Sequence, residues 1–585
     1  MTLAEYQAWL SSFDRNRCVL LILKGFSLLT NTEDTFYLSN RNYITEPTDT
    51  PANTTFLPRL LMGSGLDFTR EIGFLDSPRG DSSYGNLAID NTDGGLDFWI
   101  DYSFTGREIK ILVGDATWPY NNFTLQPFMV GTIENIEFSD FYTFSVTIRD
   151  KIGLLDKALN SNILTTGPKK NEPIPLAFGY VRNIEPVLVQ ENALVYKYND
   201  GTVQSVVDVY DNGVTLTPTS GYTVDLTTGT VTLIASPVGT ITLDLQGIKY
   251  NGVFLDTATL IVTHILTVFG GLTNADINIP SFDNLPNYPV GLYITQRENI
   301  LDVLDKIFSG VGCAYFFNFD GKFTVVKIAP LSNPVVTDVI YDYKRVRDTL
   351  QIKALPAPCW RYRLGYEKNY TVQEADRLAG SVTNPNAPDR TRVGWLGSDF
   401  RTITVSDDSV KTAYLNAVDQ EQVESIIDSH LLSLTCTTIT FVSGTSVDFT
   451  FSGSPDLSII QVGDGLKIFR GCLAKNRGSW PVTAVDNVNK KLRANVYGSN
   501  ATNNQSALAC PVEILTPRYA VVEAGLRFDV LKQQRYLCSF TSPVFTGLPG
   551  DIIQLTANRY GLAAKNIQLL KVNIKDGMTD IEGWF

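Results

Sequence analysis

Three Gly-Asp pairs, each between a turn and an apolar run, are the first candidates for catalytic carboxylates. They are Gly114-Asp115 in "ILVGDATW", Gly463-Asp464 in "QVGDGLKIF" and Gly550-Asp551 in "TGLPGDIIQLTANRYGL". An Asp in such a turn can accept hydrogen bonds from backbone amides two residues on and hold a tight corner. Because the arrangement occurs three times, we interpret these carboxylates, Asp551 included, as corner pins of β-structure rather than catalysts.

The two histidines, His264 and His430, are the only imidazoles available for proton transfer near neutral pH. Each lies among apolar neighbours in a segment that we expect to be helical. No Gly-x-Ser-x-Gly elbow or other nucleophile setting accompanies either of them. No His-Glu-x-x-His or Cys-x-x-Cys offers zinc ligands. We therefore expect two structural histidines.

The acidic stretch "IDNTDGGLDFWID" brings Asp90, Asp93, Asp97 and Asp101 close enough in sequence to suggest calcium. Their spacing does not match the helix-loop-helix calcium pattern, so we expect turn and hairpin carboxylates. Two acids brought together by the fold can hydrolyse a glycoside, and with 61 acidic residues that alternative stays open. The sequence assigns no catalytic, cofactor-binding or metal-binding residue, and we expect a protein that is not an enzyme.

The window from Lys344 to Lys368 holds seven basic residues with aromatic residues between them, which makes it the best nucleic-acid candidate. The alternation of Trp360 and Tyr362 with Arg361 and Arg363 instead predicts a strand at a solvated or subunit-facing edge. The whole chain carries 48 basic and 61 acidic residues, a net charge of −13, which disfavours tight binding of nucleic acid.

Seven scattered cysteines predict buried free thiols in a protein made in a reducing cytoplasm, although a Cys472–Cys510 pair stays an alternative. The opening residues lack a basic start followed by an apolar core. The longest apolar stretch, Val19 to Leu23, is too short for a bilayer. We expect neither a signal peptide nor a transmembrane helix.

The elements that position these residues are mostly strands. Abundant Tyr, Phe, Thr, Asn and Gly, with only four Met, is typical of β-strands and their turns. Asn212-Gly213, Thr228-Gly229 and Asp320-Gly321 each stand between alternating runs and predict hairpins, and Lys490-Lys491 marks a further hairpin tip. Helical spacing predicts helices over residues 2–10, 151–159, 256–269 and 297–311, and the longest helix over 409–432.

The length of 585 residues predicts several domains. The fold class is mainly β with α+β parts: two antiparallel barrels, a β-hairpin domain, an α+β module and an inserted small β-barrel. The predicted parts are a barrel in 1–160, a hairpin or meander domain in 161–254, an α+β module in 255–344, a second barrel with the long helix in 345–435 and 515–585, and the inserted barrel in 436–514.

Several stretches in a fixed order resemble the baseplate or tail-tip hub proteins of long-tailed bacteriophages. They are "FYLSNRNYIT", "NTDGGLDFWIDYSFTGREIKILVGDATW", "ENILDVLDKIFSGVGCAYFFNFDGKFTVVKI", "LGYEKNYTVQEADRLAGSV" and "PGDIIQLTANRYGL". The resemblance covers most of the chain except 436–514. It implies a homotrimer in which each chain contributes two barrels similar to the tail-tube fold, so that three subunits present a pseudo-sixfold ring to a sixfold tube.

The resemblance also implies the partners and the place of the protein. They are a distal tail or tail-tube protein, tip, spike or fibre proteins and the tape-measure protein, in a virion tail assembled in the bacterial cytoplasm. DNA would pass through the ring without specific binding, and no stable membrane insertion is implied. The chain shows no recognisable peptidase or lysozyme segment. The inserted domain is expected to project outward, toward a neighbouring tail component or a host glycan.

Two alternatives from other classes remain open at this point. One is a β-rich carbohydrate-active depolymerase that uses two carboxylates in a groove, against which stand seven Trp in 585 residues and the absence of a long solenoid repeat. The other is a receptor-binding tail protein without catalysis.

Overall fold

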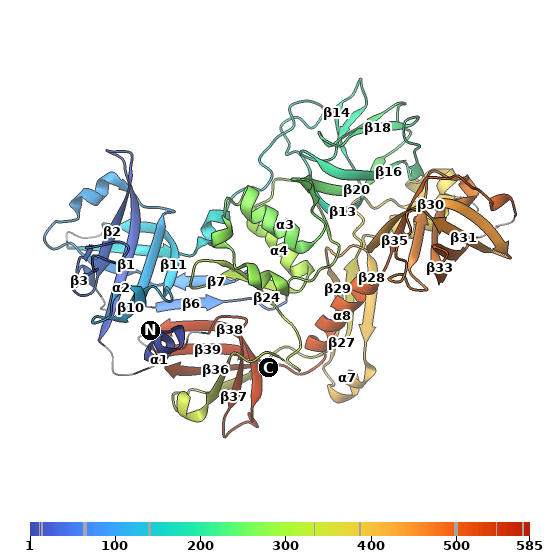
Figure 1. Cartoon of the computed structure of the whole chain (residues 1–585). Coiled ribbons are helices and arrows are strands. Elements are labelled where there is room, and N and C mark those ends of the chain that lie inside the picture. Colours follow the sequence, from blue (N-terminus) through green and yellow to red (C-terminus); the bar gives the residue numbers. More distant parts are fainter. Residues whose placement is uncertain are drawn as a thin grey trace.

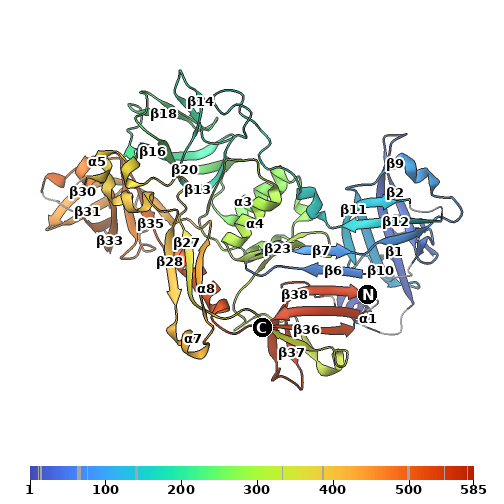
Figure 2. The same ribbon diagram turned by 180° about the vertical axis from the view of Figure 1, so that it is seen from behind.

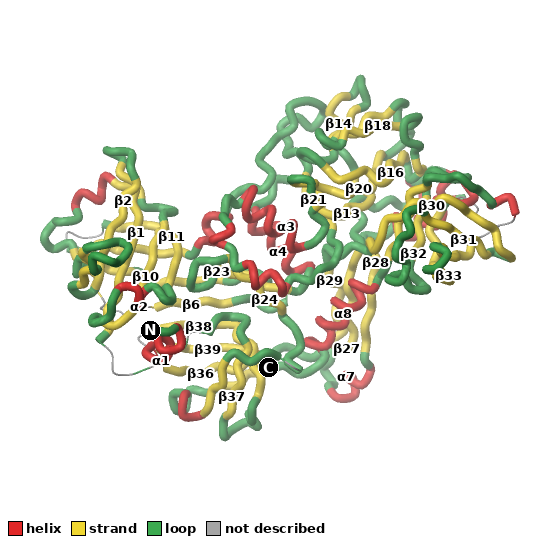
Figure 3. The backbone as a smooth tube through the Cα atoms, viewed as in Figure 1, coloured by secondary structure: helices red, strands yellow, loops and turns green. Residues whose placement is uncertain are grey.

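Strands make up most of the regular structure in the computed structural model of the protein, which confirms the mainly β, multidomain fold class. The structure describes residues 1–585 apart from 11, 13–15, 62–66, 76, 139–141, 333, 385–387, 497–500, 544, 546 and 576–577. A strongly curled sheet lies at one end, a closed barrel at the other, and most helices lie between them (Figures 1 and 3).

The first sheet is built from the N-terminal residues and is nearly closed into a barrel. Its order is β2 (Glu33–Ser39), β1 (Arg17–Ser27), β10 (Glu108–Asp115), β11 (Met129–Glu137), β12 (Thr143–Arg149), β8 (Leu87–Asp90) and β5 (Leu60–Leu61), with β9 (Tyr102–Ser103) beside β1. Leu38 in β2 forms a bridge with Leu57. Three residues after Leu57, Leu60 of β5 pairs with β8 at the other end of the strand order. This segment therefore draws the two edges of the sheet toward each other. Small elements around it are α1 (Leu3–Leu10), α2 (Tyr120–Phe123), β3 (Tyr43–Ile44) and β4 (Thr55–Phe56).

The second sheet combines the C-terminal strands with a hairpin from the N-terminal part of the chain. Its order is β25 (Asp338–Tyr341), β37 (Ile552–Thr556), β38 (Lys565–Lys575), β39 (Met578–Trp584), β36 (Tyr536–Pro543) and β26 (Gln351–Ala354), with β6 (Asp67–Glu71) on β38 and β7 (Asp81–Tyr84) on β6. The sequence placed 67–84 in the first barrel, and that assignment is wrong for these two strands. Alternation of apolar and polar residues predicts a strand, but tertiary packing selects its partner.

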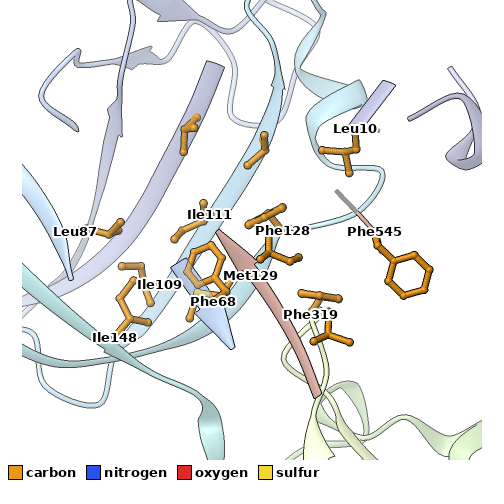
Figure 4. Packing of buried hydrophobic residues seen from close by; sticks show 14 of the residues in the cluster. Leu10, Phe68, Leu87, Ile109, Ile111, Phe128, Met129, Ile148, Phe319 and Phe545 are labelled. Carbon is orange, nitrogen blue, oxygen red and sulfur yellow. The ribbon is translucent and has the colours of Figure 1, made fainter. Parts of the chain in front are cut away.

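One continuous apolar core joins the two sheets. Phe68 of β6 lies beside Phe128, with ring centroids 5.2 Å apart, and Phe128 in turn faces Phe319 at 6.4 Å. Figure 4 shows these rings next to Ile109 and Ile111 of the first sheet. The cluster also includes Ile553, Leu555, Ile567, Leu569, Val572 and Ile581 of the second sheet. The two sheets are thus packed as one body.

The predicted hairpin and α+β parts occupy the middle of the chain. One sheet has the order β17 (Val214–Thr215), β16 (Val203–Asp211), β20 (Ile241–Tyr250), β13 (Leu176–Ile184) and β22 (Gly291–Ile294), with β21 (Val253–Phe254) on β20. A smaller sheet has the order β14 (Val187–Gln190), β15 (Val195–Lys197), β19 (Thr230–Leu233) and β18 (Tyr222–Asp225). The hairpins at Asn212-Gly213, Thr228-Gly229 and Asp320-Gly321 are confirmed, the last joining β23 (Cys313–Phe317) to β24 (Phe323–Lys327). Both residues of Asn212-Gly213 have positive φ, as a tight hairpin turn requires.

Three of the five predicted helices form as expected and two do not. Helix α1 lies within the predicted range 2–10. Helices α3 (Ala258–His264) and α4 (Ile300–Gly310) lie within the ranges 256–269 and 297–311. Only a short 3₁₀ turn, Lys151–Leu155, forms in 151–159. The long helix of 409–432 is wrong: this region contains α7 (Asp408–Ala413), β29 (Val418–Glu424) and the start of β30 (His430–Ser443). A ladder with the neighbouring strand overrides helical propensity here, because β29 pairs in parallel with β27 (Cys359–Tyr366).

The longest helix lies elsewhere, in α8 (Arg518–Leu531), which packs on the three-stranded sheet β28 (Arg401–Ser406), β27 and β29. Its buried Glu523 binds Lys327 of β24 at 2.9 Å and Arg527 at 2.8 Å, which ties the helix to the α+β part. The sequence joined 345–435 to the C-terminal strands as one barrel. The structure instead places β27, β28 and β29 in this separate sheet, and the short helices α5 (Gly380–Thr383) and α6 (Val393–Leu396) come between β27 and β28 in the chain.

A closed six-stranded barrel forms from residues 430–515, where the sequence predicted an inserted small barrel in 436–514. The strand order is β30, β31 (Ser446–Phe451), β34 (Lys491–Asn495), β33 (Gly478–Asp486), β32 (Gly465–Ile468) and β35 (Cys510–Leu515). The predicted hairpin tip at Lys490-Lys491 is confirmed between β33 and β34. The view from behind in Figure 2 shows the barrel at the opposite end of the molecule from the first sheet.

Candidate functional site

Buried charged side chains gather where the β13–β20 sheet, the loop before β30 and the closed barrel meet. We call this group the charged junction. Its members are Arg182 of β13, Asp208 of β16, Asp244 of β20, Asp428, His430 of β30, Lys467 of β32 and Glu513 of β35, all buried. Burial of so many charges is costly unless each is paired, so their contacts decide what the junction does.

Two cations connect the acids of the junction. The Arg182 guanidinium donates to both oxygens of Asp428, at 2.8 Å from Nε to Oδ2 and 2.7 Å from Nη2 to Oδ1, and to Glu513 Oε2 at 3.0 Å. Lys467 Nζ donates to Asp244 Oδ2 at 2.9 Å and to the same Glu513 oxygen at 3.2 Å. Glu513 therefore accepts hydrogen bonds from both cations, and such charge-assisted hydrogen bonds are the strong ones.

The acids of the junction have different protonation behaviour. Burial alone would raise the pKa of Glu513, but Arg182 and Lys467 lower it well below its usual range. Burial also opposes ionisation of Asp244, and Lys467, Arg392 and Arg182 together lower its pKa. For Asp208, burial is the larger effect and raises the pKa to about 6, although Lys467 and Arg470 act in the other direction.

The charged junction suits mechanical joining better than proton transfer. Arg182 and Glu513 are 331 residues apart in sequence, and Lys467 and Asp244 are 223 residues apart. Each of these contacts links the closed barrel to the central sheet. Fixed ion pairs of this kind specify one arrangement of the parts that carry them.

A polar pocket of about 480 Å³ opens beside the charged junction, and we call it the junction pocket. Tyr180 and His430 line it, and the Tyr180 ring is stacked on the His430 imidazole, with centroids 4.2 Å apart and planes 16° apart. His430 is held in turn by Glu513, at 3.2 Å from Nδ1 to Oε1. The other lining residues are Gln204, Gln246, Phe254, Asp256, Thr257, Asn287, Pro289, Leu431, Leu432, Ser433 and Tyr519.

The three Gly-Asp carboxylates hold corners, as the sequence predicted. Asp115 accepts from the Thr117 amide two residues on, at 3.0 Å. Asp464 and Asp551 instead accept from amides three residues earlier, those of Gln461 and Leu548, both at 2.8 Å. The three lie in separate elements, and none belongs to the charged junction.

One of the two histidines, His430, differs in setting from what the sequence indicated. His264 ends α3 as predicted, and burial among Phe178, Tyr250 and Phe269 lowers its pKa to about 4. The prediction that His430 lies in a helix is wrong, since His430 begins strand β30. It belongs to the charged junction, which nothing in its local sequence indicated.

The acidic stretch 89–101 forms turn contacts, as expected. Asp93 pairs with Arg59 through two hydrogen bonds of 2.7 Å, and Asp90 accepts from the Thr92 amide. Asp97 accepts from the Asn91 amide group at 2.8 Å. Within the described residues, no group of three or more His, Cys, Asp or Glu side chains is placed to hold a metal ion.

The basic window has acidic partners. Arg361 and Arg363 both bind Asp419, and Lys368 binds Glu424. The alternation is confirmed, with Tyr362 buried and the arginines half-buried. The expected edge position is wrong, because β27 is the central strand between β28 and β29.

All seven cysteines are buried and free, as the sequence predicted. Cys472 and Cys510 therefore do not form the alternative disulfide. No helix in the described part of the chain has the length and hydropathy that a membrane span requires. The charged junction and the junction pocket are what the sequence reasoning missed. Their residues come from widely separated segments of the chain, and no spacing rule connects them.

Comparisons with known proteins give remote structural matches. No protein-family model and no curated protein sequence matches the chain. Three solved structures align over 97% of it. They are a tail protein from Neisseria meningitidis (8% identity, TM-score 0.35, 97% of that chain), the 43 kDa tail protein of prophage MuSo2 from Shewanella oneidensis (7%, 0.34, 98%) and prophage tail protein gp18 from Listeria monocytogenes (9%, 0.35, 94%). These structural neighbours are phage tail proteins, and at such TM-scores the likeness carries no functional assignment for this chain.

Proposed function

We propose that the protein is a structural component of a bacteriophage tail and, more specifically, the trimeric hub of the baseplate or tail tip. The observation that carries the proposal is that the nearly closed first sheet and the second sheet share one apolar core. The sequence motifs that resemble tail hubs lie largely in these two sheets and in the α+β part that connects them.

The shared core gives a physical reason for the hub role. Three copies of a chain with two similar β-units present six units in one ring, which is how a threefold protein can meet a sixfold tube. Such a ring needs the two units of each chain to be held rigidly. Strand β6 supports this, because it pairs with β38 of the second sheet while Phe68 packs against Phe128 beside the first.

The charge of the assembly fits a conduit. Three chains of −13 give 3 × −13 = −39, and a central channel whose walls carry charge of this sign would repel a polyanion rather than retain it. In this role DNA passes without specific binding. The partners are a distal tail or tail-tube protein on one side, tip, spike or fibre proteins on the other, and the tape-measure protein. The location is the virion tail.

A non-catalytic role also fits the paired state of the charged junction. Arg182, Lys467 and Glu513 are engaged with one another and with neighbouring acids, which favours positioning over proton transfer. The closed barrel is then a peripheral module attached to the ring by this junction.

Mass measurement and electron microscopy of the purified full chain test the proposal. A trimer has a mass of 3 × 64.7 = 194.1 kDa, and class averages should show a threefold ring built of six β-units. Antibody labelling of phage particles should mark the tail axis at its distal end. A monomer that releases reducing sugars from host polysaccharide would contradict the proposal and support a depolymerase instead.

A further inference from the structure

We propose that the junction pocket binds a neutral saccharide unit. This goes beyond the hub role and does not depend on it, because the pocket lies on a single chain. Its walls come from β13, β16, β20, β21, β30 and α8, so it forms only where the central sheet, the closed barrel and α8 meet.

The size and the free polar groups of the pocket favour a hydroxyl-rich ligand. A volume of about 480 Å³ falls in the range of roughly 300–1,000 Å³ typical of small-molecule sites. Gln204 and Asn287 face it, and among the described residues neither side chain hydrogen-bonds another residue. Ser433 and Thr257 add hydroxyls. These groups donate and accept hydrogen bonds without charge, as sugar hydroxyls require.

Aromatic rings supply the second feature of a saccharide site. Tyr180, Phe254 and Tyr519 line the pocket, and Phe254 meets the Tyr180 ring edge-on at 5.2 Å. The C–H face of a pyranose packs well on such rings, because the ring face is electron-rich and the C–H groups are slightly positive. The stack on His430 holds the Tyr180 ring in place before any ligand arrives, which lowers the entropic cost of binding.

The charge of the pocket selects against anions. Asp256 is the lining carboxylate, and burial raises its pKa, with His430 acting in the opposite direction. The His430 imidazole is turned to Glu513 through Nδ1. An anionic ligand would therefore meet a carboxylate and no free cation among the described lining residues, whereas a sugar hydroxyl can donate to Asp256.

Saturation-transfer NMR with the full chain tests the proposal. The probes are glucose, galactose, N-acetylglucosamine and rhamnose, each as the free sugar and as its methyl glycoside, with choline and inorganic phosphate as non-saccharide probes. We expect at least one saccharide to bind with a dissociation constant on the order of millimolar. Binding of the methyl glycoside indicates a glycan residue as the natural ligand, and binding of the free sugar alone indicates a soluble monosaccharide.

Variants assign the binding to this pocket. Asp256→Asn and Gln204→Ala should each weaken saccharide binding about tenfold, the effect of one lost hydrogen bond. The matched control is Asp348→Asn, the same change at a highly exposed carboxylate outside the pocket, and it should leave the affinity unchanged. Thermal melting checks that each variant is folded, and Gln204→Ala serves if Asp256→Asn is not. Absence of binding by all the saccharides at 50 mM, binding of choline or phosphate alone, or unchanged affinity in both pocket variants would overturn the proposal.

Discussion

At the scale of single residues, Glu513 is the centre of the charged junction. It accepts from both Arg182 and Lys467, and these cations lower its pKa well below the usual range. Glu513→Gln keeps the shape but leaves two buried cations short of a counter-charge. We expect the free energy of unfolding at pH 7 to fall by about 3–5 kcal/mol, measured by denaturant titration.

The neighbouring Asp208 gives a matched and opposite expectation. Burial raises its pKa to about 6, so its folded form holds a proton up to higher pH than its unfolded form. Its contribution to stability is therefore greatest below about pH 4 and is lost as pH rises through 6. Asp208→Asn should be neutral below pH 4 and should stabilise the protein relative to the wild type at pH 8. If Asp208→Asn and Glu513→Gln lowered the free energy of unfolding equally at pH 8, the charges of the junction would not matter and only its shape would.

At the scale of elements, strand β6 is the connection between the two sheets. Phe68 is buried between them, so Phe68→Ala should lower the free energy of unfolding by about 3–5 kcal/mol. Phe98→Ala, at a ring that is 46% exposed, is the control and should cost less than about 1 kcal/mol. Chemical denaturation followed by tryptophan fluorescence measures both. If Phe68→Ala and Phe98→Ala lowered the free energy of unfolding by similar amounts, β6 would not be the connection between the two sheets.

The same scale shows what the sequence can predict. Asn212-Gly213 and Asp320-Gly321 are predicted correctly because a tight turn depends on residues that are adjacent in the chain. The region 409–432 is predicted wrongly because apolar residues at helical spacing also fit a strand whose ladder partner, β27, lies about 60 residues earlier. The charged junction was beyond prediction, since Arg182 meets Glu513 only after the central sheet and the closed barrel have packed together.

At the scale of the whole molecule, the chain enters the closed barrel through β30 and leaves it through β35, and these two strands pair with each other. Leu434 pairs with Val512, so residues 435–511 can be replaced by an Asn-Gly turn. The deletion removes Lys467 and leaves Asp244 with the Tyr210 hydroxyl and the Asn183 amide as its remaining close donors. We expect a lower melting temperature, partly restored by Asp244→Asn in the same background, because the neutral amide no longer needs a counter-charge.

The trimer mass of the deletion variant decides the place of the barrel in the assembly. If the barrel is peripheral, the shortened chain with Asp244→Asn should still form trimers in mass measurement. A monomeric product that melts as cooperatively as the full chain would make the barrel part of the subunit contact.

The pairing of β6 with β38 also determines when the second sheet can form during synthesis of the chain. Glu71 binds Lys571, 500 residues later, so the second sheet cannot be completed until almost the whole chain has left the ribosome. At bacterial rates of about 5–20 residues per second, β6 and β7 wait roughly 25–100 s for their partner. A fragment truncated before β38 therefore lacks the strand that β6 needs. In the proposed trimer, late completion of this kind would keep unfinished chains out of the ring.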